Sequence, residues 1–304
     1  MEKIPKKLML KCVIIGLGKI GAGYDLSNKK IVSHYKAIKK NPNIKLIGVI
    51  EKNKKKFIKI KDKKVKFFPN IKKASKEISP DLIIISVPTK IHLKIFKECT
   101  QNFKSKYFVM EKPGGSNFKE FCEIKKIIHK KNLKVVFNYM RLYDVSTNTI
   151  RNKLSNKKKF NASVVYNSDL SNNGSHFISL MLFIFGRPFK INNVKKISNI
   201  DYNFILYYKN GKIYFSSLKN KKMKGSFEIK FENNLLNYLN NGSQISLKIK
   251  EKKYLKIRNN FEFLQKFFYI NFIKNYKKKN YFNHSLKLAY STQKIINTIK
   301  RSKS

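Results

Sequence analysis

Three glycines near the start of the chain have a spacing that suits phosphate binding. They form the pattern Gly16-x-Gly18-x-x-Gly21, with Lys19 and Ile20 inside it, directly after an apolar run. In such a turn the first glycine makes the tight bend and the second lets backbone N–H groups approach a pyrophosphate. The third allows close packing of helix on strand, and the N-terminus of that helix favours the anion. The pattern predicts a dinucleotide site, with a purely structural turn as the alternative.

The partner of such a turn is an acidic residue that ends the second strand and bonds the ribose hydroxyls. Glu51 follows the apolar stretch Lys45–Ile50, but it lies 30 residues beyond Gly21, where a spacing of about 20 is usual. We attribute the excess to an insertion at Gly23–Val32. Glu51 favours NAD, whereas Lys52 and the lysines after it could accept the 2′-phosphate of NADP, so the predicted cofactor is NAD or NADP. The alternative is that Glu51 is simply a solvated strand end.

Two further loops follow predicted strands and carry polar residues. Pro88, Thr89 and His92 come after the third strand, and Glu111 and Lys112 come after the fourth, followed by a proline and two glycines. Loops at the carboxyl ends of parallel strands face the ligand crevice. A charged pair fixed in this way is unusual for a plain connector, so we expect both loops at the cofactor, with Lys112 pointing into the cleft. His92 is expected to be a loop residue and not a catalyst.

Another set of candidates lies in the middle of the chain. His176 follows Asn172 and Asn173 at the start of a predicted apolar helix. We expect these two asparagines to bind the substrate together with Tyr139 and Arg141, which could hold its hydroxyls or a phosphate. The alternative for His176 is a capping or core histidine.

The remaining histidines are interpreted as having no convergent partners: His34, His129 and His284. No pair of His or carboxylate residues has metal-ligand spacing, so we expect no metal site.

Taken together, these motifs resemble the glucose–fructose oxidoreductase / inositol dehydrogenase (Gfo/Idh/MocA) family. In chain order they are Gly16-x-Gly18-x-x-Gly21, Val87-Pro88-Thr89 with His92, Glu111-Lys112-Pro113, Arg141-Leu142-Tyr143-Asp144 and Asn173-Gly174-Ser175-His176. The resemblance covers nearly the whole chain and implies an NAD(P)-dependent oxidoreductase that acts on a sugar or sugar derivative. It implies that Lys112 lies beside the nicotinamide and the substrate hydroxyl, and that His176 is the catalytic histidine of the second domain.

The chain departs from the family pattern around this histidine. Many sugar dehydrogenases of the family carry Asp four residues before it and three after it, where this chain has Asn172 and Ser179. An amide cannot act as a general base, so the Asp–His–Lys relay is incomplete. The alternative function is a catalytically impaired dinucleotide-binding sensor or scaffold. The segment Phe137–Asp144 is most similar to members associated with surface-polysaccharide sugars.

The elements that must position these residues follow an alternating pattern in the first 140 residues. Short apolar runs predict strands at Cys12–Ile15, Lys45–Ile50, Leu82–Val87, Tyr107–Met110 and Val135–Phe137. Helical patterns between them fall at Ser33–Lys40, Ile71–Glu77, Ile91–Thr100 and Asn117–Lys130. This alternation is typical of a parallel, doubly wound sheet of the Rossmann type.

The pattern changes further along the chain. An apolar helix is predicted at Ser175–Phe185, and strands at Ser163–Asn167, Phe204–Tyr208, Lys212–Ser217, Ser226–Phe231 and Gln244–Lys248. We expect an α/β protein with a dinucleotide-binding domain (1–140), a substrate and oligomerisation α+β domain on an open, mostly antiparallel sheet (141–284), and a closing helix (285–304) packed on the first domain.

Composition limits the possible partners. The net charge is +51, but only five of the 68 cationic residues are arginine, the residue that best forks onto phosphates and guanine edges, so we expect no specific nucleic-acid binding. Polyanion binding, which rests on the charge alone, is the alternative. No apolar run is long enough to span a membrane, and three unpaired cysteines suggest a reduced, cytoplasmic protein. Alternating apolar residues such as Phe204, Leu206, Ile213 and Phe215 suggest a homo-oligomer, a dimer or tetramer, formed through the open sheet. The alternative is that additional helices cover this face.

Overall fold

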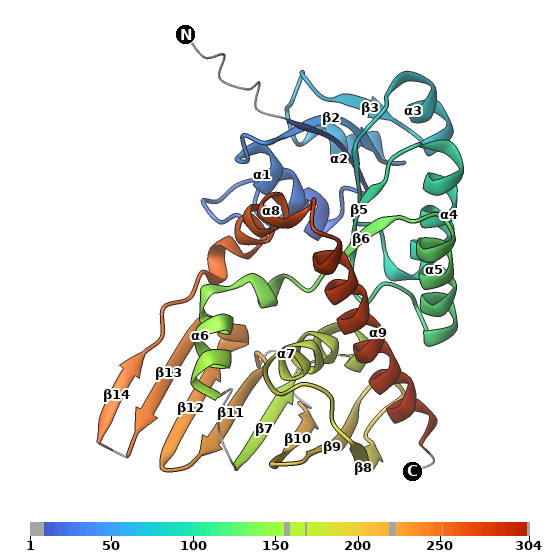
Figure 1. Cartoon of the computed structure of the whole chain (residues 1–304). Helices are drawn as coiled ribbons and strands as arrows, with labels where there is room; N and C mark the ends of the chain where they lie inside the picture. The colour runs from blue at the N-terminus through green and yellow to red at the C-terminus, as the bar shows by residue number, and fades with distance from the viewer. Residues whose placement is uncertain (1–8, 155–158, 168, 219–222, 251, 303–304) are drawn as a thin grey trace. The chain divides into compact units, whose positions relative to one another are not determined.

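A computed structural model describes residues 9–154, 159–167, 169–218, 223–250 and 252–302 (Figure 1). The chain groups into two compact units. The first unit consists of Met1–Asn138 with Phe263–Leu286, and the second of Tyr139–Glu262 with Lys287–Ser304. Residues 263–284, which the sequence interpretation assigned to the second domain, group with the first unit because their helix packs against a helix of that unit.

The first unit is built on a six-stranded parallel sheet with the order β3-β2-β1-β4-β5-β6. Its strands are β1 (Leu10–Ile15), β2 (Ile44–Ile50), β3 (Lys66–Phe68), β4 (Leu82–Ile85), β5 (Tyr107–Glu111) and β6 (Lys134–Asn138). Every residue of β4 is buried, as expected for a strand covered on both faces of a sheet. The predicted doubly wound fold is confirmed, and only the three-residue strand β3 had no predicted counterpart.

Helices surround this sheet. They are α1 (His34–Lys39), α2 (Lys54–Ile58), α3 (Ile71–Glu77), α4 (His92–Asn102), α5 (Phe118–Lys130) and α8 (Leu264–Asn275). Of these, α1, α2, α3 and α5 begin at a capping side chain. Before α3 and α5, the side chains of Asn70 and Asn117 accept hydrogen bonds from the first helical turn, at 2.9 Å in each case. Helix α8 was not predicted, and it packs against α1.

The second unit is built on an eight-stranded sheet with the order β14-β13-β12-β11-β7-β10-β9-β8. The strands are β7 (Phe160–Tyr166), β8 (Lys190–Lys196), β9 (Tyr202–Tyr208), β10 (Gly211–Ser217), β11 (Ser226–Phe231), β12 (Asn234–Leu239), β13 (Gln244–Ile249) and β14 (Lys253–Lys256). β7 and β10 run parallel and the other neighbouring pairs run antiparallel. The predicted mostly antiparallel sheet is therefore confirmed.

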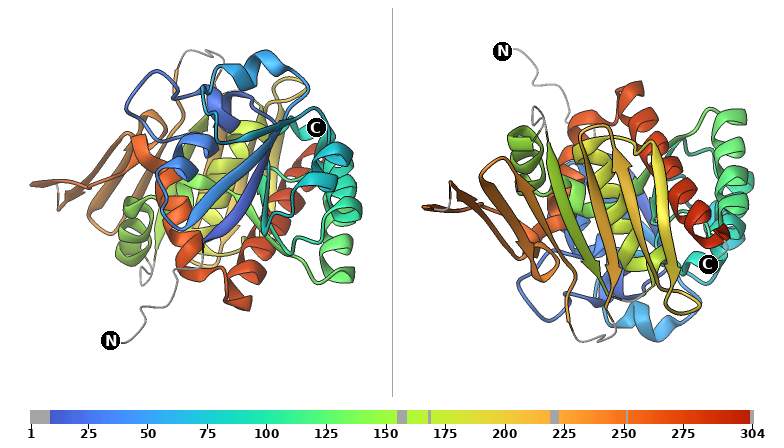
Figure 2. Two further views of the ribbon diagram at one scale, coloured as in Figure 1. Left: turned by 90° about the horizontal axis from the view of Figure 1, so that it is seen from above. Right: turned by 90° about the horizontal axis from the view of Figure 1, so that it is seen from below.

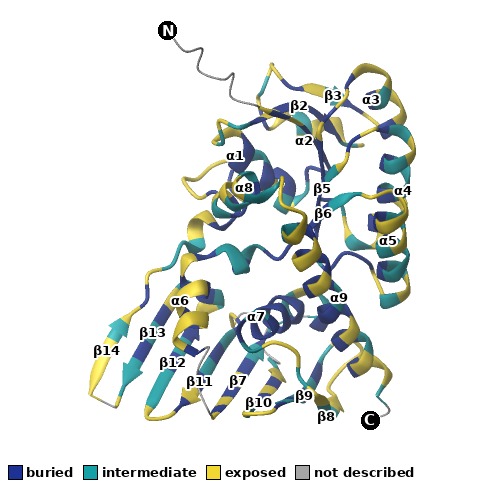
Figure 3. Ribbon diagram, viewed as in Figure 1, coloured by how far each residue is buried: buried dark blue, intermediate teal, exposed yellow. Residues whose placement is uncertain are grey.

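One face of this sheet carries the core of the second unit. Helix α7 (Ser175–Phe185) lies across it (Figure 2), with α6 (Val145–Leu154) and the later part of α9 (Lys279–Arg301) contributing further apolar side chains. Buried and more exposed residues alternate along the strands (Figure 3). From Lys287 onward α9 groups with the second unit, whereas the sequence interpretation packed 285–304 on the first domain.

The apolar residues named as an oligomerisation surface lie on the covered face. Phe204, Leu206, Ile213 and Phe215 are all buried in the core of the second unit. The expectation that these four side chains form an exposed apolar surface is wrong, because α7 and its neighbours cover them. No helix in the described part of the chain is long and apolar enough to cross a membrane.

Candidate active site

The glycine turn follows β1 directly, and its three glycines meet different surroundings. A Cβ on Gly16, whose φ is +93°, would lie 2.9 Å from the carbonyl oxygen of Ser86, and a Cβ on Gly21 would lie 2.2 Å from that of Gly16. A Cβ on Gly18 would meet nothing within 4 Å. Gly16 and Gly21 are therefore required by the packing of the turn itself, whereas Gly18 faces open space that a pyrophosphate could enter.

The segment after the glycine turn differs from the expected helix. Lys19–Gly23 forms one short π-helical turn, in which Lys19 is exposed and Ile20 half-buried, and α1 begins only at His34. Asp25, within the proposed insertion, is buried and accepts hydrogen bonds from the backbone N–H groups of Val32 and Ser33 at 2.7 and 2.8 Å. Residues 23–32 thus form a loop that is held by the Asp25 carboxylate and that separates the glycine turn from helix α1.

A cavity of about 310 Å³ opens at the carboxyl ends of the strands of the first unit. Gly16, Gly18, Glu51 and Pro88 are among the residues that line it. The Glu51 carboxylate accepts hydrogen bonds from the backbone N–H groups of Leu17 at 2.7 Å and Asn53 at 3.1 Å. Glu51 is therefore not a freely solvated strand end, because it ties the end of β2 to the glycine turn at the edge of the cavity.

Cationic side chains share this cavity with Glu51. Lys52 and Lys56 line it, and Lys56 Nζ lies 3.8 Å from Glu51 Oε2. The lysines that could accept a 2′-phosphate are thus at the same place as the carboxylate that favours a free ribose hydroxyl.

His92 connects the two predicted cofactor loops. It is fully buried, with Nε2 2.9 Å from the carbonyl oxygen of Val87 and Nδ1 3.1 Å from that of Gly114. Burial lowers the pKa of His92 below its usual value, with nearby Lys112 acting in the same direction and Glu111 against it. Its position between carbonyl oxygens suits a structural loop residue, while Thr89 beside it is half-buried at the start of a short helical turn.

Glu111, at the end of β5, is the centre of a buried polar group that we call the His34 network. Its members are His34, Glu111, Asn138, Gln265 and Tyr269, all at most 8% exposed. Glu111 Oε1 lies 2.9 Å from His34 Nε2 and accepts a 2.5 Å hydrogen bond from Asn138 Nδ2. Because these contacts favour the carboxylate form, they hold the pKa of Glu111 below its usual value despite burial.

The other side of the imidazole is held by α8. Tyr269 Oη lies 2.7 Å and Gln265 Nε2 2.9 Å from His34 Nδ1, and Gln265 Oε1 accepts a 3.0 Å hydrogen bond from Asn138. Because the amide nitrogen of Gln265 can only donate, Nδ1 accepts, and the ring proton lies on Nε2, toward Glu111. The expectation that His34 has no convergent partners is wrong.

The signals for this network are weak in the sequence. Gln265 and Tyr269 are four residues apart, as side chains on one helix face are, but α8 itself was not predicted. Nothing in the spacing connects α8 with His34. The two meet because the chain from Phe263 onward belongs to the first unit again.

Lys112 follows the network directly and is half-buried. It precedes Pro113 through a cis peptide bond, and Pro113, Gly114 and Gly115 are buried. The side chain that we predict to be catalytic thus extends from a backbone segment fixed on one side by Glu111 and on the other by His92.

The candidates of the second unit lie around the start of α7. His176 is 7% exposed, and its ring makes an edge contact with Tyr139, with the centroids 6.2 Å apart. Arg141 is buried, and its guanidinium carbon lies 4.9 Å from the centroid of the Phe177 ring. The structure thus brings Tyr139, Arg141 and His176 into one region of the second unit.

The two positions that differ from the family pattern have different surroundings. Asn172 is exposed, and Ser179 Oγ donates a 2.8 Å hydrogen bond to the backbone carbonyl of His176. Asn173 Oδ1 accepts a 3.3 Å bond from the backbone of Asn167. Neither Asn172 nor Ser179 supplies a carboxylate to the imidazole. Lys112 lies in the first unit and His176 in the second, so their shared action on one substrate hydroxyl stays a prediction.

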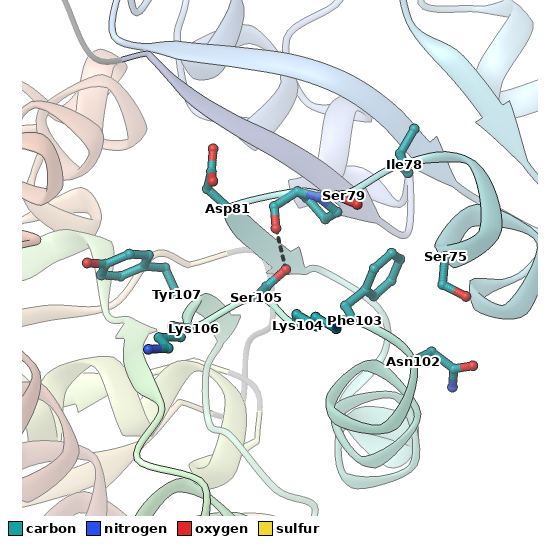
Figure 4. A pocket seen from close by; sticks show the side chains of 11 residues that line it. Ser75, Ile78, Ser79, Asp81, Asn102, Phe103, Lys104, Ser105, Lys106 and Tyr107 are labelled. Carbon is teal, nitrogen blue, oxygen red and sulfur yellow. Dashed lines mark hydrogen bonds between the residues drawn. The ribbon is translucent and has the colours of Figure 1, made fainter.

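A second cavity in the first unit lies away from these residues. It has a volume of about 510 Å³ and is lined by segments that precede β4 and β5, including Asp81 and Lys106 (Figure 4). The amino ends of parallel strands lie at the opposite edge of the sheet from the glycine turn, so this cavity is not part of the candidate active site. Among the described residues, no three His, Cys, Asp or Glu side chains gather as metal ligands would.

Comparison with known proteins agrees with this geometry. Residues 10–139 match the family model of Gfo/Idh/MocA, described as an oxidoreductase family with an NAD-binding Rossmann fold. This match supports the resemblance over the first unit, whereas the motifs at Arg141 and His176 lie outside the matched residues. No curated protein sequence matches the chain.

Solved structures share the fold of both units. The dehydrogenase MviM from Clostridium difficile is 18% identical, with a TM-score of 0.75 over 95% of this chain and 99% of that one. WlbA dehydrogenase from Bordetella pertussis, in complex with NADH and UDP-GlcNAcA, is 12% identical, with a TM-score of 0.74 over 97% and 96%. A UDP-N-acetylglucosamine 3-dehydrogenase from Acidithiobacillus ferrooxidans is 11% identical, with a TM-score of 0.72 over 96% and 97%.

Proposed function

Because residues 10–139 form the NAD-binding Rossmann fold of the Gfo/Idh/MocA oxidoreductases, we propose that the chain transfers a hydride between a nicotinamide and a carbinol carbon of a sugar or sugar derivative. The single observation that carries this proposal is the open space at Gly18 beside the cavity at Glu51. Gly18 would receive the pyrophosphate of a dinucleotide there, and Glu51 would face its ribose hydroxyls. When bound, the cofactor supplies the hydride acceptor or donor.

The chain's own residues would move the proton and stabilise charge. His176 exchanges the proton of the substrate hydroxyl as acid or base, and Lys112 stabilises the charge that develops on the same oxygen. With Asn172 in place of the family Asp, no carboxylate at that position raises the basicity of His176. Tyr139 and Arg141 hold the substrate beside them. Solved structures of the same fold include an enzyme named as a UDP-N-acetylglucosamine 3-dehydrogenase, which supports a sugar-type substrate. A role in surface-polysaccharide metabolism rests on the motif resemblance of Phe137–Asp144.

The dinucleotide site is tested by the variant Gly18→Val. Gly18 has φ −65° and ψ −169°, which valine can adopt, and its Cβ would point into open space. We expect NADH binding, measured by calorimetry, to weaken at least tenfold, which is about 1.4 kcal/mol, with no change in the urea midpoint. The control is Gly23→Val, whose Cβ would make an ordinary 3.5 Å contact and should leave binding unchanged. Undiminished binding by Gly18→Val would place the cofactor elsewhere.

A catalytically impaired sensor is the second candidate function. It is favoured by the exposed Asn172 and by Ser179, whose hydroxyl is bonded to the backbone. The two functions are separated by following the nicotinamide absorbance of the NAD⁺-loaded protein with a panel of nucleotide sugars. Turnover with any of them, lost in Lys112→Ala, supports the enzyme; tight NADH binding without turnover supports the sensor.

We extend the proposal to assembly and location. A homodimer or homotetramer through the outer face of the second-unit sheet is supported by Tyr214 and Leu239, which are 38% and 41% exposed. A cytoplasmic location is supported by the three free cysteines, Cys12, Cys99 and Cys122. A monomeric mass in light scattering at micromolar concentration would contradict the assembly.

A further inference from the structure

Arg141 has a buried guanidinium whose N–H donors are only partly paired by the described residues of the second unit. The residue is 7% exposed. Its Nη2 donates a 3.2 Å hydrogen bond to Asn241 Oδ1, and its guanidinium carbon lies over the ring of Phe177, 4.9 Å from the centroid. Its Nε and Nη1 atoms are buried and have no hydrogen-bond partner among the described residues. A guanidinium has five N–H donors, so most of its hydrogen-bonding capacity is unused.

No carboxylate in the described part of the chain balances this charge. Asp144, three residues further on, uses Oδ1 for the backbone N–H of Ser146 at 2.8 Å and Oδ2 for that of Asn260 at 2.9 Å. The titratable neighbour of Arg141 is Tyr238, and burial raises the pKa of that hydroxyl to about 12, so it is neutral at physiological pH. Burial lowers the pKa of Arg141, yet an arginine remains charged in proteins.

The fold nevertheless holds the guanidinium in a defined place. Asn241, its acceptor, has a positive φ of 60° and bonds through its N–H to the carbonyl of Gly225 at 2.7 Å. Tyr238 Oη donates a 3.1 Å bond to the carbonyl of Asn241. The Phe177 ring packs so closely on Gly225 that a Cβ there would lie 2.6 Å from it. An arginine fixed on two sides in this way is preorganised, and flexible disorder does not explain its unused donors.

We propose that Arg141 receives an anionic group of the substrate, so that the substrate is an acidic sugar carrying a carboxylate or a phosphate. Leaving a charged group buried without a partner is costly, and arginine is the side chain best suited to carboxylate and phosphate oxygens. The inference rests on the proposed function in that its ligand is the substrate of that site. It adds the chemical class of the substrate, which the family match does not give.

The first test uses the stability of the protein without substrate. Arg141→Met replaces the incomplete cation by an apolar chain of similar length, and we expect a urea midpoint equal to or above that of the wild type. The matched control is Arg151→Met, since Arg151 is exposed and lies 4.7 Å over Phe183 in the same unit. A marked loss of stability in Arg141→Met alone would show that the guanidinium serves the fold, and would overturn the proposal.

The second test uses anions at constant ionic strength. We expect inorganic phosphate to raise the urea midpoint of wild type and Arg151→Met more than that of Arg141→Met. Equal shifts in all three proteins would mean binding to the lysine-rich surface only, and would also overturn the proposal.

The third test identifies the source of the anion with NADH-saturated protein. Calorimetry compares glucose with glucuronate, glucose 6-phosphate and UDP-glucose, and we expect at least one anionic ligand to bind tenfold or more tighter than glucose. That ratio should be lost in Arg141→Gln, while NADH affinity is unchanged. Discrimination that survives in Arg141→Gln, or no ligand discriminated by the wild type, would contradict the proposal. Failure of NADH to bind the wild type would instead contradict the proposed function and leave the phosphate result standing.

Discussion

The two units each bury a group of polar side chains, but they differ in how many of the buried donors and acceptors have hydrogen-bond partners. In the His34 network, side chains from α1, β5, β6 and α8 bond to one another, and the carboxylate of Glu111 receives two of the contacts. Only a neutral carbonyl oxygen, Asn138 Oδ1, lacks a partner among the described residues. At Arg141, by contrast, a charged group is left incomplete.

This difference suggests different tasks. A satisfied buried network fixes one geometry, and Glu111 is covalently joined to Lys112, so the first unit uses its network to position a side chain. An unsatisfied buried charge gains most from an added ligand, so the second unit keeps Arg141 for binding.

The largest effect is expected for turnover. Lys112→Ala should lower kcat by about 10²- to 10⁴-fold, the range for a positioned acid–base or charge-stabilising group. NADH binding should be spared, because the lysine acts on charge that develops only as the hydride moves. His176→Ala should lower kcat less at high pH, where solvent replaces the proton acceptor. Stopped-flow measurement of nicotinamide absorbance, with whichever sugar of the proposed panel the wild type turns over fastest, checks both predictions. Equal turnover in Lys112→Ala and wild type would contradict the role given to the first unit.

The next effect concerns the stability supplied by the His34 network. Glu111→Ala removes the shared acceptor of His34 and Asn138 and leaves two buried donors unsatisfied, at about 1–3 kcal/mol each, so we expect the free energy of unfolding to fall by about 2–6 kcal/mol. The control is Glu123→Ala, whose ion pair with Lys97 has both side chains 44% exposed. Such an exposed pair should contribute less than about 1 kcal/mol. Urea titrations that give similar losses for both variants would mean that the network is not a tight structural unit.

A smaller loss is expected for the hydroxyl from α8. Tyr269→Phe removes the 2.7 Å contact with His34 but leaves Gln265 on the same ring nitrogen. We expect about 1 kcal/mol, the usual net value of one hydrogen bond. Tyr254→Phe is the control, because Tyr254 is 65% exposed and its 2.7 Å bond to Ser246 can be replaced by water. A larger loss in Tyr254→Phe would reverse the ranking of buried and exposed hydroxyls.

The contrast between the two units also explains what the sequence alone could predict. The glycine turn, the Glu51 position and the loops at Pro88 and Glu111 are local patterns beside buried strands, so motif and periodicity found them. The His34 network joins residues 235 positions apart through a helix whose period was not recognised. Edge strands such as β8 and β14 were missed because most of their residues are exposed and carry little apolar alternation.

Arg141 is a residue whose role the sequence predicted but whose pairing it could not. Its motif marked it as a substrate residue, but its missing counter-charge depends on Asp144 turning both oxygens to backbone groups. The exposed apolar surface was predicted wrongly for a similar reason, since alternation gives the two faces of a strand without saying which one α7 covers.

The smallest effect is the pH dependence of stability, and it separates two buried groups of the first unit. The folded pKa of His92 is lowered from 6.5 by burial, so the unfolded chain takes up its proton first. The contribution of His92 is full above about pH 6.5 and is lost as the pH falls through the folded pKa. The folded pKa of Glu111 is lowered from 4.5, so its contribution is full above that pH and is lost only in more acidic solution.

These two windows can be separated with two variants. We expect His92→Gln to remove the pH dependence of the urea midpoint between about pH 7 and 5, because the unfolded pKa of the histidine lies near 6.5. The fall of the midpoint in more acidic solution, which we call the acid limb, should remain. Glu111→Gln should reduce the fall of the urea midpoint below about pH 4.5, near the unfolded pKa of a glutamate. The change of the midpoint between about pH 7 and 5 should remain, because it belongs to His92. Because Lys112 and Glu111 both act on His92, Glu111→Gln should also move the His92 midpoint slightly to lower pH. If His92→Gln instead removes the acid limb, the carboxylate of the His34 network does not govern acid stability, and the positioning role assigned to it loses its electrostatic basis.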